Sequence, residues 1–266
     1  MQDGQRPSLE RALDKTESAA EGVLRAASAV TSALKRFRGA AHVGNLRDLR
    51  AAIVATDQAL VGLREQFADA RDGWDFDEEA YFEDGSFAAE LLETAERLNL
   101  GLFQLDERMY SYPVLVRLLP GDRSVMIDKT RERRVRPTIL VNHLRELQRR
   151  PPRFRPEAFL EALHDAYTAI AAQRQRGRPT EGTVVRLVDV YDLFTLLPGQ
   201  SKEYSKQEFA RDIYLLDQSG LTTTRRGSVV SLPASTGTRS AGSTIRVITQ
   251  DGQEKAYFGL AFTAAG

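Results

Sequence analysis

The first third of the chain carries apolar residues at alternating intervals of four and three. This 3.5-residue period is typical of a helix that packs against another helix. The first run comprises Leu9, Leu13, Thr16, Ala20, Val23, Ala27, Val30, Leu34 and Phe37. Gly39 and Gly44 interrupt it, and Asn45 is the predicted N-cap of a second helix. The second run comprises Leu46, Leu49, Ile53, Thr56, Leu60, Leu63 and Phe67. The pattern predicts an antiparallel helical hairpin whose thin seam needs a third helix or a partner.

Residues 72–96 hold ten acidic side chains and no basic one. The pattern predicts a turn at Asp84-Gly85 and a helix over residues 86–98. Aromatic residues lie among the acidic ones. Because aromatic rings anchor and charges steer, this segment suits docking of a basic partner. The candidate partner-binding residues are Trp74, Phe76, Tyr81 and Phe82. A solvated acidic surface is the alternative.

The middle of the chain predicts a β-hairpin over residues 114–127, with its turn at residues 120–123. A helix follows from Pro137 and ends before Pro151-Pro152. Residues 129–155 carry ten basic side chains against two acidic ones. Residues 131–136 are expected on a loop entering this helix, and Arg149 and Arg150 at its end. Arginine forks match phosphate oxygens, so this segment is a candidate for nucleic-acid backbone contact.

The C-terminal third predicts helices from Pro156, over residues 188–197, and over residues 206–219. The third helix opens with a capping box, Ser205 to Glu208, and ends at Gly220. The strand predictions are a short strand over residues 183–187, a hairpin over 221–232 turning at Arg226-Gly227, and a final hairpin turning at Asp251-Gly252. Phe258, Leu260 and Phe262 are expected on its return strand. Residues 173–179 and 235–243 are expected to be connecting segments.

This order of helices and strands over residues 156–232 resembles the winged-helix superfamily. The resemblance implies that the helix from Ser205 to Ser219 stands where the recognition helix stands, and that Arg225 and Arg226 occupy the wing tip. The chain departs from a DNA-binding pattern, because Lys206 and Arg211 are the only basic residues of that helix. The same helix has three acidic residues, so its charge is more typical of the winged helices that bind proteins.

Composition adds constraints on the class of protein. The 266 residues have a formal net charge of zero. That zero is a cancellation between the acidic first 110 residues and the basic segment 129–155. The absence of cysteine excludes disulfides, thiolate nucleophiles and cysteine-ligated metals. No stretch has the length of a membrane helix, and the N-terminus lacks the apolar region of a secretory signal. These features favour a bacterial-type cytoplasmic protein without a membrane partner.

The chain carries no recognisable catalytic motif. His42, His143 and His164 lack metal-ligand spacing, and the acidic cluster around Asp75 and Asp77 does not match a calcium loop. The Arg36-x5-His42 spacing is similar to the motif of the HEPN ribonucleases, but Phe37 occupies a position that is usually polar in that family. We therefore expect no catalytic residue, no metal and no cofactor.

The sequence thus predicts a mostly helical α+β protein with three parts. These are a helical hairpin or bundle at residues 1–110, a β-hairpin and basic helix at 111–155, and a winged-helix-like domain with an extra β-hairpin at 156–266.

The favoured function is a non-enzymatic accessory or assembly subunit of a DNA-handling complex. Its protein partner would be another subunit or a second copy, bound through the heptad helices. The candidate nucleic-acid contacts are Arg131, Arg133, Arg134, Arg136, Arg149, Arg150, Lys206, Arg211, Arg225 and Arg226. One alternative is a protein-interaction scaffold without nucleic-acid contact; a weaker one is a metal-dependent or HEPN-like nuclease.

Overall fold

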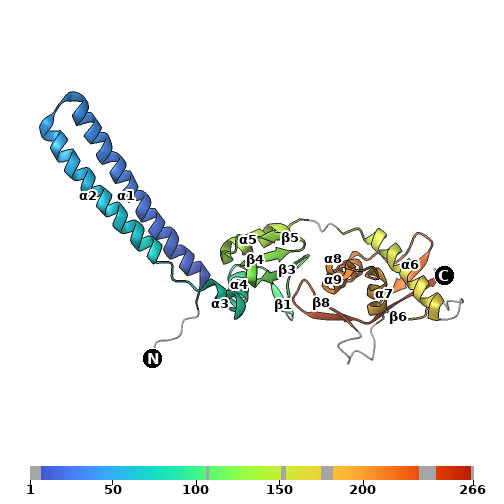
Figure 1. Cartoon of the computed structure of the whole chain (residues 1–266). Helices are drawn as coiled ribbons and strands as arrows, with labels where there is room; N and C mark the ends of the chain where they lie inside the picture. Colours follow the sequence, from blue (N-terminus) through green and yellow to red (C-terminus); the bar gives the residue numbers. More distant parts are fainter. Residues whose placement is uncertain (1–6, 106–107, 151–153, 175–181, 234–243, 265–266) are drawn as a thin grey trace, which may run out of the picture. The chain divides into compact units, whose positions relative to one another are not determined.

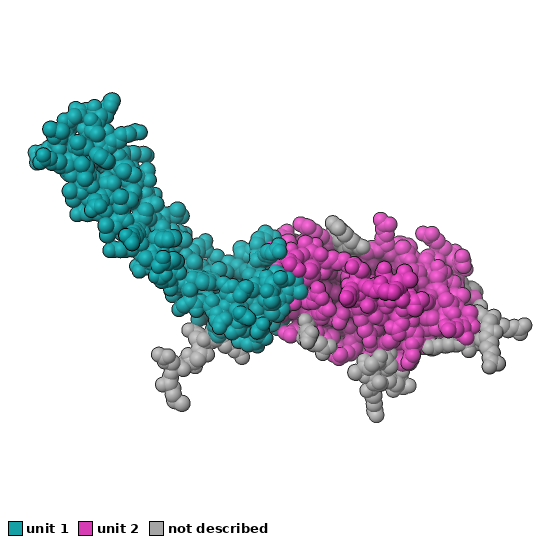
Figure 2. Space-filling view, viewed as in Figure 1, with its two compact units in different colours: residues 1–94, 119–124, 133–141 teal, residues 95–118, 125–132, 142–266 magenta. Residues whose placement is uncertain are grey.

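The computed structural model describes residues 7–105, 108–150, 154–174, 182–233 and 244–264. The fold is α+β and mostly helical, as predicted. The chain forms two compact units, coloured teal and magenta in Figure 2. Unit 1 contains residues 1–94, 119–124 and 133–141, and unit 2 contains residues 95–118, 125–132 and 142–266. This division differs from the three consecutive parts expected, because the chain passes between the units several times.

The predicted helical hairpin dominates unit 1. Helices α1 (Leu9–Val43) and α2 (Leu46–Asp72) lie side by side, joined by Gly44 and Asn45 (Figure 1). The Asn45 side chain accepts a hydrogen bond from the Asp48 backbone N–H, which confirms the predicted N-cap. The predicted break at Gly39 is wrong. The helix continues through it, because one glycine costs only about 1 kcal/mol in a packed helix. It ends at Gly44, which has the left-handed φ of 72°.

The acidic segment folds into two short helices. Helix α3 (Glu78–Glu83) was not predicted; its N-cap is Asp77, whose carboxylate accepts from the Ala80 backbone N–H. Helix α4 (Ser86–Arg97) follows the turn at Gly85, which has a φ of 84°, so the predicted turn and helix are confirmed. Phe87 and Leu91 of this helix are fully buried.

A five-stranded antiparallel meander occupies the middle of the chain. Its strands are β1 (Phe103–Leu105), β2 (Arg108–Ser111), β3 (Val114–Leu119), β4 (Ser124–Ile127) and β5 (Thr130–Glu132). The predicted hairpin is β3 and β4, joined by the short 3-10 helix η1 (Pro120–Asp122). Arg131 was expected on a loop, but it lies on β5 opposite Met126. Helix α5 (Pro137–Gln148) begins at the expected proline.

The core of unit 2 forms around the C-terminal helices and strands. The helices are α6 (Pro156–Arg174), α7 (Leu187–Phe194), α8 (Gln200–Glu203) and α9 (Lys206–Ser219). Leu163, Phe209, Ile213 and Leu260 belong to one buried cluster. The capping box at Ser205 begins helix α9 and the left-handed Gly220 ends it, as predicted. Helix α8 was not predicted.

The C-terminal strands pair differently from the expectation. They are β6 (Val185–Arg186), β7 (Ser228–Ser231), β8 (Ile245–Ile248), β9 (Glu254–Tyr257) and β10 (Gly259–Ala264). The expected 221–232 hairpin forms over a short stretch. Thr223 bridges Val229, and the Val230 N–H donates to the Thr222 carbonyl at 2.8 Å. On its other edge, strand β7 pairs with β10, which also pairs with β6, giving the order β6-β10-β7. The expected return strand divides at Phe258, so that β9 pairs with β8 and β10 with the other sheet. The connecting segment 235–243 and most of 173–179 lie outside the described residues.

Gly259 marks a close approach of β10 to β6. A Cβ atom at this position would lie 2.6 Å from the Val185 carbonyl oxygen and 2.8 Å from the Val184 Cγ1 atom. Because the first of these is backbone, a side chain could be placed only by moving the strands apart. We predict that Gly259→Ala lowers the free energy of unfolding of unit 2 by about 1–3 kcal/mol. Urea unfolding followed by circular dichroism measures this loss.

Gly121 provides the control for that substitution. No atom lies within 4 Å of a Cβ placed there. Gly121→Ala should therefore change the free energy of unfolding by no more than about 0.5 kcal/mol. Equal effects of the two substitutions would contradict the close approach.

Candidate functional site

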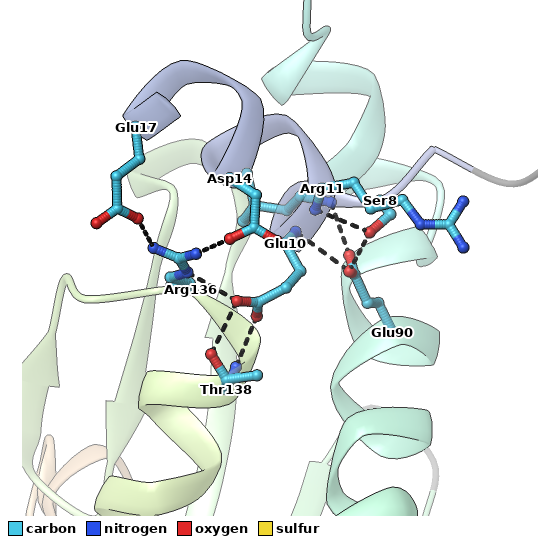
Figure 3. A network of polar contacts seen from close by, with 9 residues as sticks. Ser8, Glu10, Arg11, Asp14, Glu17, Glu90, Arg136 and Thr138 are labelled. Carbon is cyan, nitrogen blue, oxygen red and sulfur yellow. Dashed lines mark hydrogen bonds and ion pairs between the residues drawn. The ribbon is translucent and has the colours of Figure 1, made fainter. Parts of the chain in front are cut away.

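The guanidinium of Arg136 meets three carboxylates of helix α1 (Figure 3). Its Nε atom donates to Glu10 Oε1 at 2.7 Å and its Nη1 atom to Glu17 Oε2 at 2.6 Å, while Nη2 contacts Asp14. The three acidic residues are spaced by four and three positions, so they share one side of the helix. Arg136 directly precedes the first residue of α5. The network therefore joins the beginning of α5 to the first turns of α1, within unit 1.

Glu10 has a second task at the same place. Its carboxylate accepts from the Thr138 backbone N–H at 2.9 Å and from the Thr138 hydroxyl at 2.8 Å. It thus satisfies a free N–H group in the first turn of α5. Burial by itself would raise the pKa of Glu10, but the hydrogen bonds from Arg136 and Thr138 outweigh it and lower that pKa. The hydrogen bonds to Glu17 and Glu10 raise the pKa of Arg136.

Helix α1 is capped in turn by Glu90 of α4. The Ser8 hydroxyl donates to Glu90 Oε1 at 2.6 Å, and the Leu9 backbone N–H donates to Glu90 Oε2 at 2.8 Å (Figure 3). The buried hydroxyl of Tyr81 contacts the same carboxylate. Burial, together with the hydrogen bond to Glu90, raises the pKa of that hydroxyl, which therefore stays protonated.

These contacts correct two of the predicted nucleic-acid contacts. Arg136 is committed to carboxylates, and its side chain is only 27% exposed. Arg211 is committed as well: its Nη1 atom donates to Asp128 at 2.8 Å and its Nε atom to Asp212 at 3.1 Å. A phosphate at either arginine would have to displace carboxylates that already satisfy its donors. Both residues hold the fold together and are not available surface cations.

The other predicted basic contacts lie nearer to solvent. Lys206, on the first turn of α9, is half-buried. Arg149 donates to Glu146 at 3.0 Å, an exposed pair within one turn of chain. Such a pair is weak, so it leaves the arginine able to exchange partners. The remaining candidates are exposed: Arg131, Arg133, Arg134, Arg150, Arg225 and Arg226.

The predicted aromatic docking surface is half wrong. Tyr81 and Phe82 are buried, so they cannot anchor a separate partner. Phe82 stacks on Phe87 with ring centroids 4.4 Å apart, and Tyr81 packs edge-on against Phe76 at 4.9 Å. Trp74 is half-buried, as is Phe76. Within the acidic segment, Glu78 pairs with Arg123 at 2.9 Å.

The contact between α1 and α2 differs in part from the predicted one. Each predicted apolar run consists of two lines of residues, and within each line the residues recur every seven positions. Only one line of each helix lies in the contact, as shown by the buried Val30 on α1 and Thr56 on α2. The second line of contact is built from alanines three residues further on, such as Ala33, which is 3% exposed, and the half-buried Ala52. The alanine line of α1 comprises Ala12, Ala19, Ala26, Ala33 and Ala40. Its uniform spacing of seven residues is the signal that sequence reasoning missed.

This alanine seam leaves large apolar side chains in solvent. On α2 the predicted line Leu46, Ile53, Leu60 and Phe67 is between 48% and 70% exposed. On α1 the corresponding Leu34 is 46% exposed. We call these five residues the apolar face. Several exposed large apolar residues gathered on one side of an element are a mark of an interaction surface.

The tip of the hairpin also holds a cavity of about 520 Å³ between α1 and α2. Its walls are mostly alanine and glycine, with Arg36 and Asp48 as the charged residues. Arg36 of the HEPN-like spacing lies in this cavity wall, whereas His42 is exposed on the last turn of α1.

Comparisons with other proteins give no relatives. The chain matches no protein-family model, no curated protein and no solved structure. Within the described ranges, no group of three or more histidine, cysteine or acidic side chains is placed to hold a metal ion. No helix in the described part of the chain is both long and apolar enough to cross a membrane.

The Arg136 network predicts a dependence of stability on pH. The lowered pKa of Glu10 means that its contribution is fully present above its ordinary value of 4.5 and is lost as the pH falls through the folded-state value. We expect Arg136→Met to lower the free energy of unfolding at pH 7 by about 1–2 kcal/mol, since Asp14 and Glu17 remain largely solvated. The variant should also lose less stability than the wild type between pH 5 and pH 3. Urea unfolding at both pH values measures this.

Arg133→Met is the matched control, because Arg133 is exposed and lies three residues away. Its stability and its pH dependence should stay within about 0.5 kcal/mol of the wild type. If the two variants behave alike, the network does not stabilise unit 1.

Proposed function

We propose that this protein is a non-enzymatic assembly subunit, and that the hairpin of α1 and α2 is its docking arm for a protein partner. The observation that carries the proposal is the apolar face. Its α2 residues recur every seven positions, which is the repeat of a helix prepared to pack against a further helix. We also propose a cytoplasmic location, on the ground of the cysteine-free sequence.

The free energy of covering this face supports the proposal. Each square ångström of apolar surface removed from water contributes about 25 cal/mol. The side chains concerned are large, and their helix backbone is already ordered before binding. A partner would therefore gain their burial without the entropic cost of folding the arm.

The C-terminal part fits the same role. The order α6, β6, α7, α9, β7 is the one on which the proposed winged-helix-like character of residues 156–232 rests. The central strand of the sheet, β10, comes from outside that range. The ion pairs of Arg211 with Asp128 and Asp212 remove a cation from the helix in the recognition position. This favours a winged helix that binds protein over one that reads DNA.

A second candidate function is contact with the nucleic-acid backbone within a DNA-handling complex. The observation that favours it is the exposure of basic residues on and after β5, namely Arg131, Arg133 and Arg134. Contacts of this kind are independent of sequence and weaken steeply with salt.

Neighbouring residues of α2 provide a matched test of the docking arm. Leu60 lies on the apolar face and is 48% exposed, whereas Val61 is 51% exposed and points about 100° further round the helix. In affinity purification from the native host, Leu60→Lys should reduce the recovery of a partner protein at least tenfold, and Val61→Lys should not. If no protein depends on Leu60, the proposed docking arm is wrong.

The nucleic-acid candidate has its own test with duplex DNA. At 50 mM salt, the triple substitution of Arg131, Arg133 and Arg134 by serine should weaken binding at least tenfold. It should also make the salt dependence of the affinity shallower, by about 0.9 in the logarithmic slope for each phosphate that no longer meets an arginine. Serine at Arg25, Arg64 and Arg71 removes the same charge from the hairpin and should have little effect. Fluorescence anisotropy measures both, and no binding by the wild type at 50 mM salt contradicts this function.

A further inference from the structure

Leu34 of α1 and the exposed apolar line of α2 lie on the same side of the hairpin. Leu34 stands four residues after the buried Val30, and the exposed line of α2 stands four residues after its buried heptad line. On each helix the alanine line stands three residues after the buried line. The exposed residues of the two helices are thus rotated in the same sense from the seam. In two antiparallel helices, equal rotations of this kind point to one side of the pair. The cavity lined by Arg36 and Asp48 opens on the other side of the hairpin, where the alanine lines of the two helices lie.

The hairpin also carries a gradient of charge along its length. The first turns of α1 bear Glu10, Asp14, Glu17 and Glu21 against two basic residues. The tip, residues 34–50, bears five basic residues and one acidic residue. Arg136 pairs with the acidic end, yet the Glu17 side chain remains 61% exposed there. The two ends of one hairpin therefore have opposite charge.

From these two features we infer that the occupant of the apolar face is a second copy of this chain, bound antiparallel. This inference rests on the proposed function and names its partner. A two-fold axis across the middle of the face turns the basic tip of one hairpin onto the acidic base of the other. Helix α1 then faces the partner's α1, which brings Glu17 opposite Arg38 of the partner subunit. Two copies aligned tip to tip would instead bring like charges together.

The spacing of the apolar residues fits this symmetry. Leu46, Ile53, Leu60 and Phe67 are evenly spaced, so the line reads with the same intervals from either end. A two-fold axis at Leu60 lets the line interdigitate with its own copy, with Ile53 near Phe67 of the partner subunit. Gly22 of α1 lies beside Gln66 of α2, so Leu60 is level with residue 28 of α1, midway between Glu17 and Arg38. The result is a four-helix arrangement that covers the thin seam of each hairpin.

The first test is the oligomeric state of the purified full chain. Sedimentation velocity should show a wild-type dimer that dissociates on dilution. Leu60→Lys should weaken the dimer at least tenfold, while Val61→Lys should leave it unchanged. A wild-type monomer at about 100 μM overturns the inference. In that case the docking arm still stands if Leu60→Lys reduces the recovery of another host protein, and is wrong if no protein depends on Leu60. Equal effects of the two substitutions would overturn it too, since the apolar face would not be the interface.

The second test fixes the orientation of the two copies. Because the chain has no cysteine, single cysteines can be introduced without background. Residues 17 and 38 are separated by about 31 Å along α1 at 1.5 Å per residue. A 10 Å thiol crosslinker should join Glu17→Cys to Arg38→Cys in a mixture of the two variants, and neither variant to itself. Circular dichroism verifies that each variant keeps its helices. Crosslinking of Arg38→Cys to itself would show a tip-to-tip dimer and contradict the antiparallel arrangement.

Discussion

Unit 1 depends on carboxylates that stand at the first turns of helices to which they do not belong. Glu90 of α4 accepts from the first backbone N–H groups of α1, and Glu10 of α1 accepts from the first turn of α5. Arg136 then ties Glu10 to Asp14 and Glu17. The starts of α1 and α5 are thus each completed by a carboxylate from another helix. Arg136, although it belongs to the basic segment 129–155, therefore stabilises the fold.

Away from the Arg136 network, the alanine seam between α1 and α2 holds the hairpin together but buries little apolar surface. Small side chains such as Ala33 and Ala52 let two helices meet closely, but they bury little apolar surface. The larger residues are displaced to the flank, where Ile53, Leu60 and Phe67 stay in solvent. A long hairpin of this composition keeps much of its apolar surface uncovered. That property unites the proposed docking arm with the proposed antiparallel pair.

Features that depend on a few consecutive residues were predicted from the sequence, whereas contacts between residues far apart in the sequence were not. The N-cap at Asn45, the capping box at Ser205 and the helix end at Gly220 depend on a few consecutive residues, so their sequence suffices. The sequence of one helix does not show which of its apolar lines will pack against the other helix of the hairpin. That choice depends on whether leucine or alanine residues pack better across the contact between α1 and α2. Likewise, nothing near Arg136 or Arg211 in sequence identifies Glu10 or Asp128 as a partner. The pairing of β7 with β10 spans the segment between residues 231 and 259, beyond the reach of local turn rules.

That last pairing has a kinetic consequence. Strand β10 stands between β6 and β7 and pairs with both, while β7 also forms hydrogen bonds with residues 222–224 on its other edge. The sheet can therefore close only after residues 259–264 have left the ribosome, long after α6 and β6 have been made. Until then Val185, which is buried in the finished protein, lacks the strand that it pairs with. Unit 2 thus combines a late central strand with long loop closures, while the hairpin of unit 1 can close from neighbouring residues alone. Synthesis of this chain passes through a stage with a finished hairpin and an unfinished sheet.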